Sequence, residues 1–260
     1  MMNTLLHELG TGHDKTVVMI HGTGMSWDML HSAANLLAEH YHVILVSVPG
    51  HDPKTTEEFT SVEQIAAEIE TAMTDMGYTT VELLYGLSMG GGIALRMLAD
   101  NRIQFRRAVI DAGITPYELP WVVTRMILLK DFLMTEWGKH SKRALSLAFP
   151  PEEYSQEAVD GMFHALQNMT AKTIWRVYDS TDNYAMPAVF PKLDTKIEYW
   201  YGSREEKERK LDIRYIQKHI PTVRFRRIPD MKHGQYVMTQ PERFVADIRK
   251  RMEHIRKKRG

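Results

Sequence analysis

The sequence predicts an α/β fold in which a doubly wound, mostly parallel sheet is interrupted by a helical insertion. Short apolar runs alternate with amphipathic helical patterns over residues 17–113, and this alternation returns after residue 192. Residues 114–191 instead show helical periodicity with no clear strand. With 260 residues, of which 43% are hydrophobic, the chain can bury one substantial core. We therefore expect a core formed by residues 1–113 and 192–260, with residues 114–191 inserted in it.

The first elements follow a strand, helix, strand order. Residues 17–20 and 42–48 are apolar runs of the kind found in buried parallel strands, and the spacing between them predicts a helix over 26–40. A second amphipathic helix is expected over 62–76, capped by Thr60 or Ser61. The remaining expected elements are strand 81–85, helix 89–100, strand 105–111, strand 196–201, helix 204–219, strand 222–228 and a last helix beginning at Pro241.

Composition excludes several kinds of chemistry. The absence of cysteine rules out disulfides, thiolate zinc sites, iron–sulfur clusters and a cysteine nucleophile. No phosphate loop of the G-x-x-x-x-G-K type, no H-E-x-x-H and no paired metal-ligand spacing occurs, so we expect neither a cofactor nor a metal.

Charge and hydropathy indicate where the protein works. The longest apolar run, 43–48, is far too short to span a membrane, and residues 1–10 do not resemble a secretory signal. We expect a cytoplasmic protein. Lys and Arg balance Asp and Glu at 33 each, but seven of the cations lie in residues 249–260. Cations are favoured at a helix C-terminus, so we interpret this tail as a solvated helix end and expect no nucleic-acid partner.

A nucleophile is predicted within residues 86–90, which fit the pattern G-x-S-x-G. The pattern follows an apolar strand and opens a helix, a context that places Ser88 on a sharp turn at the C-terminal edge of the sheet. Such a turn strains the serine backbone and leaves no room for side chains two positions before and after the serine. Gly86 and Gly90 meet this requirement because they have no side chain.

A serine needs a base, and His233 is the histidine best placed to serve. It lies in a turn-rich loop after the last predicted strand, at the same sheet edge as Ser88. Gly22, Thr23 and Gly24 follow the first buried strand at that edge too. The backbone N–H groups of Thr23 and Met89 could form an oxyanion hole, with Gly22 and Gly24 letting the backbone approach the substrate.

These pieces resemble the α/β-hydrolase superfamily of serine hydrolases over nearly the whole chain. Residues 21–24, the Pro-Gly turn in 48–51, the elbow at 86–90 and the histidine loop at 231–234 occur in the order typical of the family. The resemblance implies that residues 114–191 form a helical cap over the catalytic crevice and shape substrate choice.

The third member of the expected triad stays open among three carboxylates. The family usually places its acid shortly after the strand that follows the cap, where this chain offers Glu205 and Glu206 in place of the commoner aspartate. Glu205 is the first choice, although 204–210 is also typical of a solvated helix start. Asp111, at the end of the strand before the cap, is the other candidate, because some family members place their acid there.

The resulting hypothesis is a cofactor-independent serine hydrolase that cleaves small carboxylic esters. Thioester, amide or peptide, acyl-transfer and carbon–carbon cleavage reactions could use the same residues, and a silent ligand-binding homologue is the alternative outside catalysis. Trp121 and the other tryptophans and methionines of the insertion favour apolar substrates, although most of them are needed for the insertion's own core.

Overall fold

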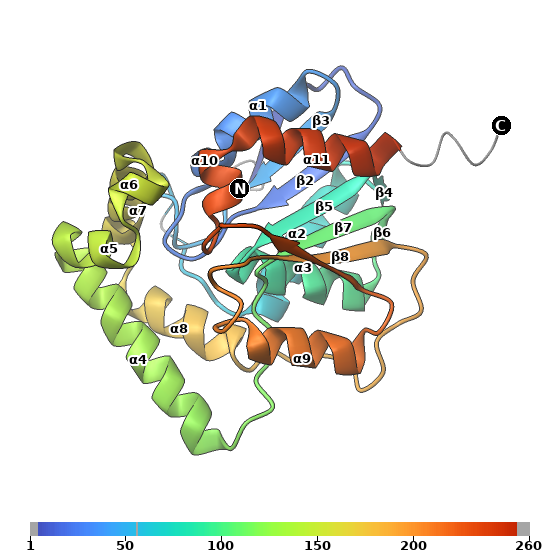
Figure 1. Ribbon diagram of the computed structural model, residues 1–260. Coiled ribbons are helices and arrows are strands. Elements are labelled where there is room, and N and C mark those ends of the chain that lie inside the picture. Colours follow the sequence, from blue (N-terminus) through green and yellow to red (C-terminus); the bar gives the residue numbers. More distant parts are fainter. Residues whose placement is uncertain (1–4, 56, 254–260) are drawn as a thin grey trace.

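The computed structural model describes residues 5–55 and 57–253 and contains the expected α/β sheet (Figure 1). Seven strands lie in the order β1-β3-β2-β5-β7-β8-β9. All neighbouring pairs are parallel except β1 and β3, which are antiparallel. The strands are β1 (Leu6–Leu9), β2 (Thr16–Ile20), β3 (His42–Val46), β5 (Leu83–Leu87), β7 (Arg107–Asp111), β8 (Lys196–Gly202) and β9 (Arg224–Ile228).

Helices cover both faces of this sheet, as a doubly wound fold requires. Helix α1 packs against α11 on one face, and α2 packs against α3 on the other, where α9 also lies (Figure 1). Their bounds are α1 (His31–Ala38), α2 (Val62–Asp75), α3 (Met89–Asp100), α9 (Lys210–His219), α10 (Gln235–Thr239) and α11 (Pro241–Glu253). The central strands β2, β3, β5 and β7 are buried along their whole length, which explains their nearly continuous apolar sequences.

A helical segment connects β7 to β8, within the range expected for the insertion. Its helices are α4 (Trp121–His140), α5 (Lys142–Ala148), α6 (Pro151–Tyr154), α7 (Gln156–Asn168) and α8 (Ala171–Thr181). Leu166 of α7 lies 3.1 Å from the position that a Cβ on Gly24 would occupy, so the segment contacts the loop that follows β2. The α4–α8 segment therefore borders the C-terminal edge of the sheet (Figure 1).

Several element boundaries differ from the prediction. Strand β1 was not expected; only Leu6 of its four residues is buried, so its sequence lacks a buried-strand pattern. The helix expected over 26–40 divides into the 3-10 helix η2 (Trp27–Leu30) and α1. Residues 104–105 form β6, which pairs with β4 (Thr80–Val81) in a separate two-stranded sheet rather than continuing into β7.

The end of the basic tail, residues 254–260, lies outside the described residues. No helix within the described ranges is both long and apolar enough to span a membrane.

Candidate active site

Ser88 occupies the turn between β5 and α3 in a strained conformation. Its φ of 55° and ψ of −114° lie outside the regions that an ordinary side chain adopts. The backbone is held there by its own N–H, which donates to the carbonyl of Asp111 at 2.8 Å. A Cβ on Gly86 would lie 2.2 Å from the carbonyl oxygen of Gly90, so this turn requires glycine.

The loop after β2 lies directly beside this serine. A Cβ on Gly22 would come within 3.3 Å of the Ser88 Cβ. His21 fixes the loop because its Nε2 accepts the Val48 N–H at 3.2 Å, which leaves Nδ1–H to donate to the Gly22 carbonyl at 2.9 Å. Burial lowers the pKa of His21 to about 4, so the ring is neutral and already fully engaged. His21 thus positions the loop and is not available as a base.

The two residues expected to form an oxyanion hole are Met89, next to Ser88 in sequence, and Thr23, next to Gly22 in the adjacent loop. Met89 is the first residue of α3, so its N–H has no acceptor within the helix. Thr23 follows Gly22, and its Oγ1 is buried without a hydrogen-bond partner in the part of the chain that the structure describes. The region beside Ser88 therefore offers polar groups that remain free to bind a ligand.

The structure brings His233 and Glu205 together. His233 Nδ1 lies 2.7 Å from Glu205 Oε2, and Glu205 is only 5% exposed. Glu205 Oε1 accepts the Gly202 N–H at 2.9 Å, while Arg209 Nε lies 3.7 Å from Oε2. Burial alone would raise the pKa of Glu205, but His233 and Arg209 outweigh burial and hold the pKa below its ordinary value. The carboxylate is therefore ionised at neutral pH.

The other two candidate acids have different hydrogen-bond partners. Glu206 is paired with Arg227 at 2.8 Å on the surface side of the turn. Asp111 accepts a hydrogen bond from the Tyr85 hydroxyl at 2.7 Å. Burial raises the pKa of Asp111 to about 7, and the neighbouring negative charge of Glu205 adds to this effect. Neither of them is the hydrogen-bond partner of His233.

The predicted helix start at residue 204 was wrong, and the reason concerns the acid. Residues 203–209 form turns, and α9 begins only at Lys210. Glu205 folds back so that one carboxylate oxygen accepts the N–H of Gly202 at the end of β8 and the other contacts His233. The charge pattern of this stretch is typical of a helix start, but the buried position of Glu205 is decided by tertiary contacts.

The turn that carries Glu205 and the loop that carries His233 pack against each other. The histidine loop also packs against β5, the strand that precedes Ser88. A Cβ on Gly202 would lie 2.1 Å from the Met231 carbonyl oxygen, so only glycine permits this approach. On the other side, a Cβ on Gly234 would lie 3.3 Å from Leu87 Cδ2, next to Ser88 in sequence. All three expected catalytic side chains are therefore positioned at one sheet edge by close backbone packing.

Helix α6 makes contacts with the histidine loop that the sequence did not reveal. The Tyr154 hydroxyl donates to the His233 carbonyl at 2.9 Å, and Gln235 Nε2 donates to the Glu153 carbonyl at 2.8 Å. Lys232 Nζ pairs with the Glu153 carboxylate at 2.9 Å. These residues are far apart in sequence and carry no motif, whereas Arg209 could have been found from its i,i+4 spacing to Glu205.

A cavity of ≈ 370 Å³ begins at the loop after β2 and extends among the helices of the α4–α8 segment. Most of its lining is apolar, and the residues are Thr23, Gly24, Asp131, Met134, Thr135, Trp137, Gly138, Ala144, Leu145, Leu147, Ala148, Phe149, Met162, Leu166 and Tyr178. Trp121, which we expected to bind substrate, is not part of this lining; it is 70% exposed at the start of α4.

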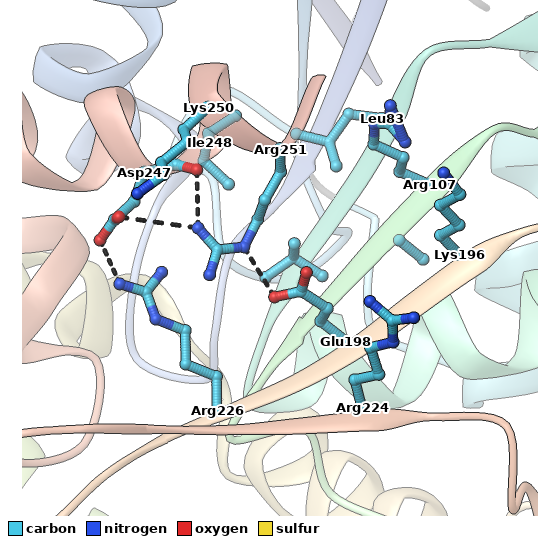
Figure 2. A pocket seen from close by; sticks show the side chains of 12 residues that line it. Leu83, Arg107, Lys196, Glu198, Arg224, Arg226, Asp247, Ile248, Lys250 and Arg251 are labelled. Atoms are coloured by element: carbon cyan, nitrogen blue, oxygen red, sulfur yellow. Dashed lines mark hydrogen bonds and ion pairs between the residues drawn. The ribbon is translucent and has the colours of Figure 1, made fainter. Parts of the chain in front are cut away.

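A second groove, of ≈ 380 Å³, lies at the opposite end of the strands (Figure 2). Leu83, Arg107, Lys196 and Arg224, the first residues of four parallel strands, line it together with α11. Figure 2 shows that its wall is an ion-pair network, in which Arg251 joins Glu198 and Asp247. Its lining contains no serine or histidine, so it is not a candidate for the hydrolytic site. Within the described ranges, no three metal-ligating side chains converge.

Comparison with known proteins agrees with this architecture. A family model described as "Alpha/beta hydrolase family" matches residues 17–248, and the chain belongs to this family. An alpha/beta hydrolase family protein from Desulfitobacterium hafniense shares the fold, with a TM-score of 0.75, 20% identity and coverage of 95% of this chain and 100% of that chain.

Two solved esterases have the same fold at similarly low identity. The esterase from Exiguobacterium antarcticum matches with a TM-score of 0.74 and 17% identity, covering 95% of this chain and 94% of its own. A thermophilic esterase from Thermogutta terrifontis matches with a TM-score of 0.72 and 17% identity, covering 96% and 93%. At these identities, the likeness establishes the fold alone.

Proposed function

We propose that this protein is a cofactor-independent serine hydrolase that cleaves carboxylic esters of small molecules. Ser88 is the nucleophile, His233 the general base and then acid, and Glu205 the carboxylate that orients the histidine. The observation that carries the proposal is the 2.7 Å contact from Glu205 to His233 Nδ1, at the sheet edge where Ser88 is held in a strained turn. The esterases that share the fold agree with this reaction class.

The hydrogen bond to Glu205 determines which nitrogen of His233 can act. Because Nδ1–H donates to the carboxylate, the neutral ring has its lone pair on Nε2, which can accept the Ser88 hydroxyl proton. Ser88 Oγ then bonds to the ester carbonyl carbon, and the N–H groups of Thr23 and Met89 stabilise the resulting oxyanion.

The remaining steps return the enzyme to its starting state. The tetrahedral intermediate collapses, its bond to the alcohol oxygen breaks, and His233 gives its proton to the leaving alcohol. Water next loses a proton to His233 and attacks the acyl-enzyme carbonyl carbon. The carboxylic acid leaves as Ser88 Oγ regains the proton from His233.

The α4–α8 segment acts in this proposal as the cap, and the cavity beside Thr23 receives the apolar part of the substrate. Its lining of leucine, methionine and aromatic side chains favours an apolar acyl or alkyl group. The unpartnered Oγ1 of Thr23, a residue that lines this cavity, can donate a hydrogen bond to, or accept one from, a polar group near the ester.

Labelling and turnover together test the assignment. Wild-type protein should react covalently with a fluorophosphonate at Ser88 and hydrolyse p-nitrophenyl esters, whereas Ser88→Ala should do neither while keeping the same circular dichroism spectrum. Ser146→Ala is the matched control, because Ser146 Oγ only donates to the Lys142 carbonyl within its own helix. Labelling without ester turnover would move the reaction to thioesters or amides, and an unlabelled wild type would contradict the proposal.

A further inference from the structure

Helix α4 carries an apolar stripe on the side that faces away from the rest of the molecule. Thr124, Leu128 and Gly138 are the buried residues of this helix. Five large apolar side chains lie on the opposite side, and each of them is between 48% and 67% exposed: Val122, Met126, Leu129, Leu133 and Trp137. At about 100° per residue they lie within about 80° of one another around the helix, so they form a continuous stripe. In Figure 1 this outer side of α4 has no neighbouring element.

The stripe is as large as the largest apolar patch of a typical monomeric protein. Its five side chains leave on the order of 600 Å² exposed on one side of the helix, and such a patch usually measures about 300–600 Å². A stable protein–protein interface buries about 800 Å² on each partner, and somewhat more than half of that area is apolar, so the stripe supplies the apolar part of one such half.

The order of residues along the stripe indicates what covers it. In an antiparallel pair related by a two-fold axis at the middle of α4, Val122 faces Trp137, Met126 faces Leu133, and Leu129 meets its own copy. A small side chain therefore lies opposite the largest one at both ends, which is the complementarity that an interface between identical chains requires.

Charge on α4 agrees with a second copy better than with an anionic membrane surface. Arg125, Lys130 and Lys139 are nearly balanced by Asp131 and Glu136, so the helix has no marked excess of cations. Arg125 is paired with Asp179 of α8 within the same chain, so the contact between two copies rests on the apolar stripe and not on an ion pair of this residue.

We propose that the outer face of α4 is a homodimer interface, in which the α4 helices of two chains pack antiparallel around Leu129. The consequence for the active site rests on the proposed function. Met134, Trp137 and Leu147 are exposed and line the cavity that begins at Thr23. Since Val122 of the partner subunit faces Trp137, the partner helix packs against this wall of the cavity from outside.

Sedimentation equilibrium tests the dimer directly. The wild-type chain should behave as a particle of about 60 kDa, twice its mass of 30.1 kDa. Leu133→Glu should shift it to a monomer with an unchanged circular dichroism spectrum, because the side chain is exposed in the single chain. Val189→Glu is the control, since Val189 is 83% exposed and lies outside α4. A monomeric wild type, or a dimer that Leu133→Glu and Leu129→Glu leave intact, would overturn the proposal.

Cross-linking tests the register independently of activity. The chain has no cysteine, so Leu129→Cys introduces a single thiol beside the two-fold axis. Mild oxidation should give a disulfide-linked dimer on a non-reducing gel, whereas Val189→Cys should stay monomeric there.

A wild type that sediments as a monomer but binds lipid vesicles through α4 would assign the stripe to a membrane surface instead.

Ester turnover then separates the two proposals. If the dimer supports this wall of the cavity, Leu133→Glu should raise KM for long-chain p-nitrophenyl esters by several-fold with little change for the acetate. A dimer without serine-dependent turnover would sink the hydrolase assignment and leave the interface intact. A monomeric wild type with serine-dependent turnover would overturn the interface and leave the hydrolase assignment intact.

Discussion

At the scale of single residues, the contrast between Glu205 and Asp111 decides how the candidate site works. Both carboxyls are buried, but Glu205 faces His233 and Arg209, whereas Asp111 faces a tyrosine hydroxyl and the negative charge of Glu205. Positive partners keep Glu205 ionised, while burial keeps Asp111 largely protonated below pH 7. Only the ionised group can stabilise a histidine that gains a proton during the reaction.

Paired substitutions of the two acids should give opposite results. Glu205→Gln should lower kcat by about 10³–10⁴-fold, because His233 loses the negative charge that stabilises its protonated form. Asp111→Asn should leave kcat nearly unchanged, since the side-chain oxygen of Asn can still accept the hydrogen bond from the Tyr85 hydroxyl. Steady-state hydrolysis of a p-nitrophenyl ester is the measurement, and a larger loss in Asp111→Asn would transfer the role to Asp111.

The raised pKa of Asp111 predicts a pH-dependent cost to stability. Its pKa is about 7 in the folded protein and 3.8 ordinarily, so between those values the folded protein holds a proton that the unfolded chain has lost. The free energy of unfolding therefore falls as pH rises through this window, and the cost is complete above pH 7. Asp111→Asn should match wild type near pH 4 and exceed it by on the order of 4 kcal/mol at pH 8. Urea denaturation at the two pH values tests this, and an equal difference at both would contradict it.

At the scale of elements, the glycines around the strand-to-helix turn set the geometry of Ser88. Gly86→Ala places a methyl group 2.2 Å from a backbone carbonyl oxygen that cannot move without displacing α3. We expect this substitution to cost more than about 4 kcal/mol or to prevent folding. Gly12→Ala, where a Cβ meets nothing within 4 Å, should change stability by less than about 0.5 kcal/mol. Chemical denaturation of the two variants measures the contrast.

The elements that the sequence predicted well are those with strong local patterns. Helices α3 and α11 begin at the expected residues, and the buried strands coincide with apolar runs. Strand β1 was missed because its pairing with β3 is decided by a distant strand rather than by its own pattern. The predicted start of helix α9 lies six residues before the observed one. The charged stretch favours a helix locally, whereas in the structure Glu205 turns inward to contact His233 and Gly202.

At the scale of the whole molecule, the fold brings residues far apart in sequence to one edge of the sheet. The order of the motifs predicted that Ser88 and His233 would meet, since parallel strands end on the same side. The sequence could not choose the acid, because it offered three carboxylates and only their partners in the folded chain separate them: His233 for Glu205, Tyr85 for Asp111 and Arg227 for Glu206. It also could not locate the cavity, whose wall combines the loop after β2 with helices more than a hundred residues later.

Because the cavity is formed between the core and the α4–α8 segment, filling it should change substrate choice without touching the catalytic residues. Ala148 is exposed and lines the cavity, so Ala148→Trp should occupy its volume without overpacking the core. We expect kcat/KM to fall by at least about tenfold for long-chain p-nitrophenyl esters and to stay nearly constant for the acetate. Ala171→Trp, at an exposed position outside the cavity lining, is the control; an equal loss for all chain lengths would contradict the assignment of this cavity.

Hydrogen bonds and an ion pair link Tyr154 and Glu153 of α6 to the loop that carries His233, so α6 and this loop move together. A ligand that favours one position of the α4–α8 segment must therefore also favour one position of the His233 backbone. Linkage of this kind is reciprocal, so an aligned histidine favours a filled cavity by the same free energy with which a filled cavity aligns the histidine. Under the proposed function, occupancy of the cavity and alignment of His233 are therefore coupled equilibria, and release of the product shifts both together.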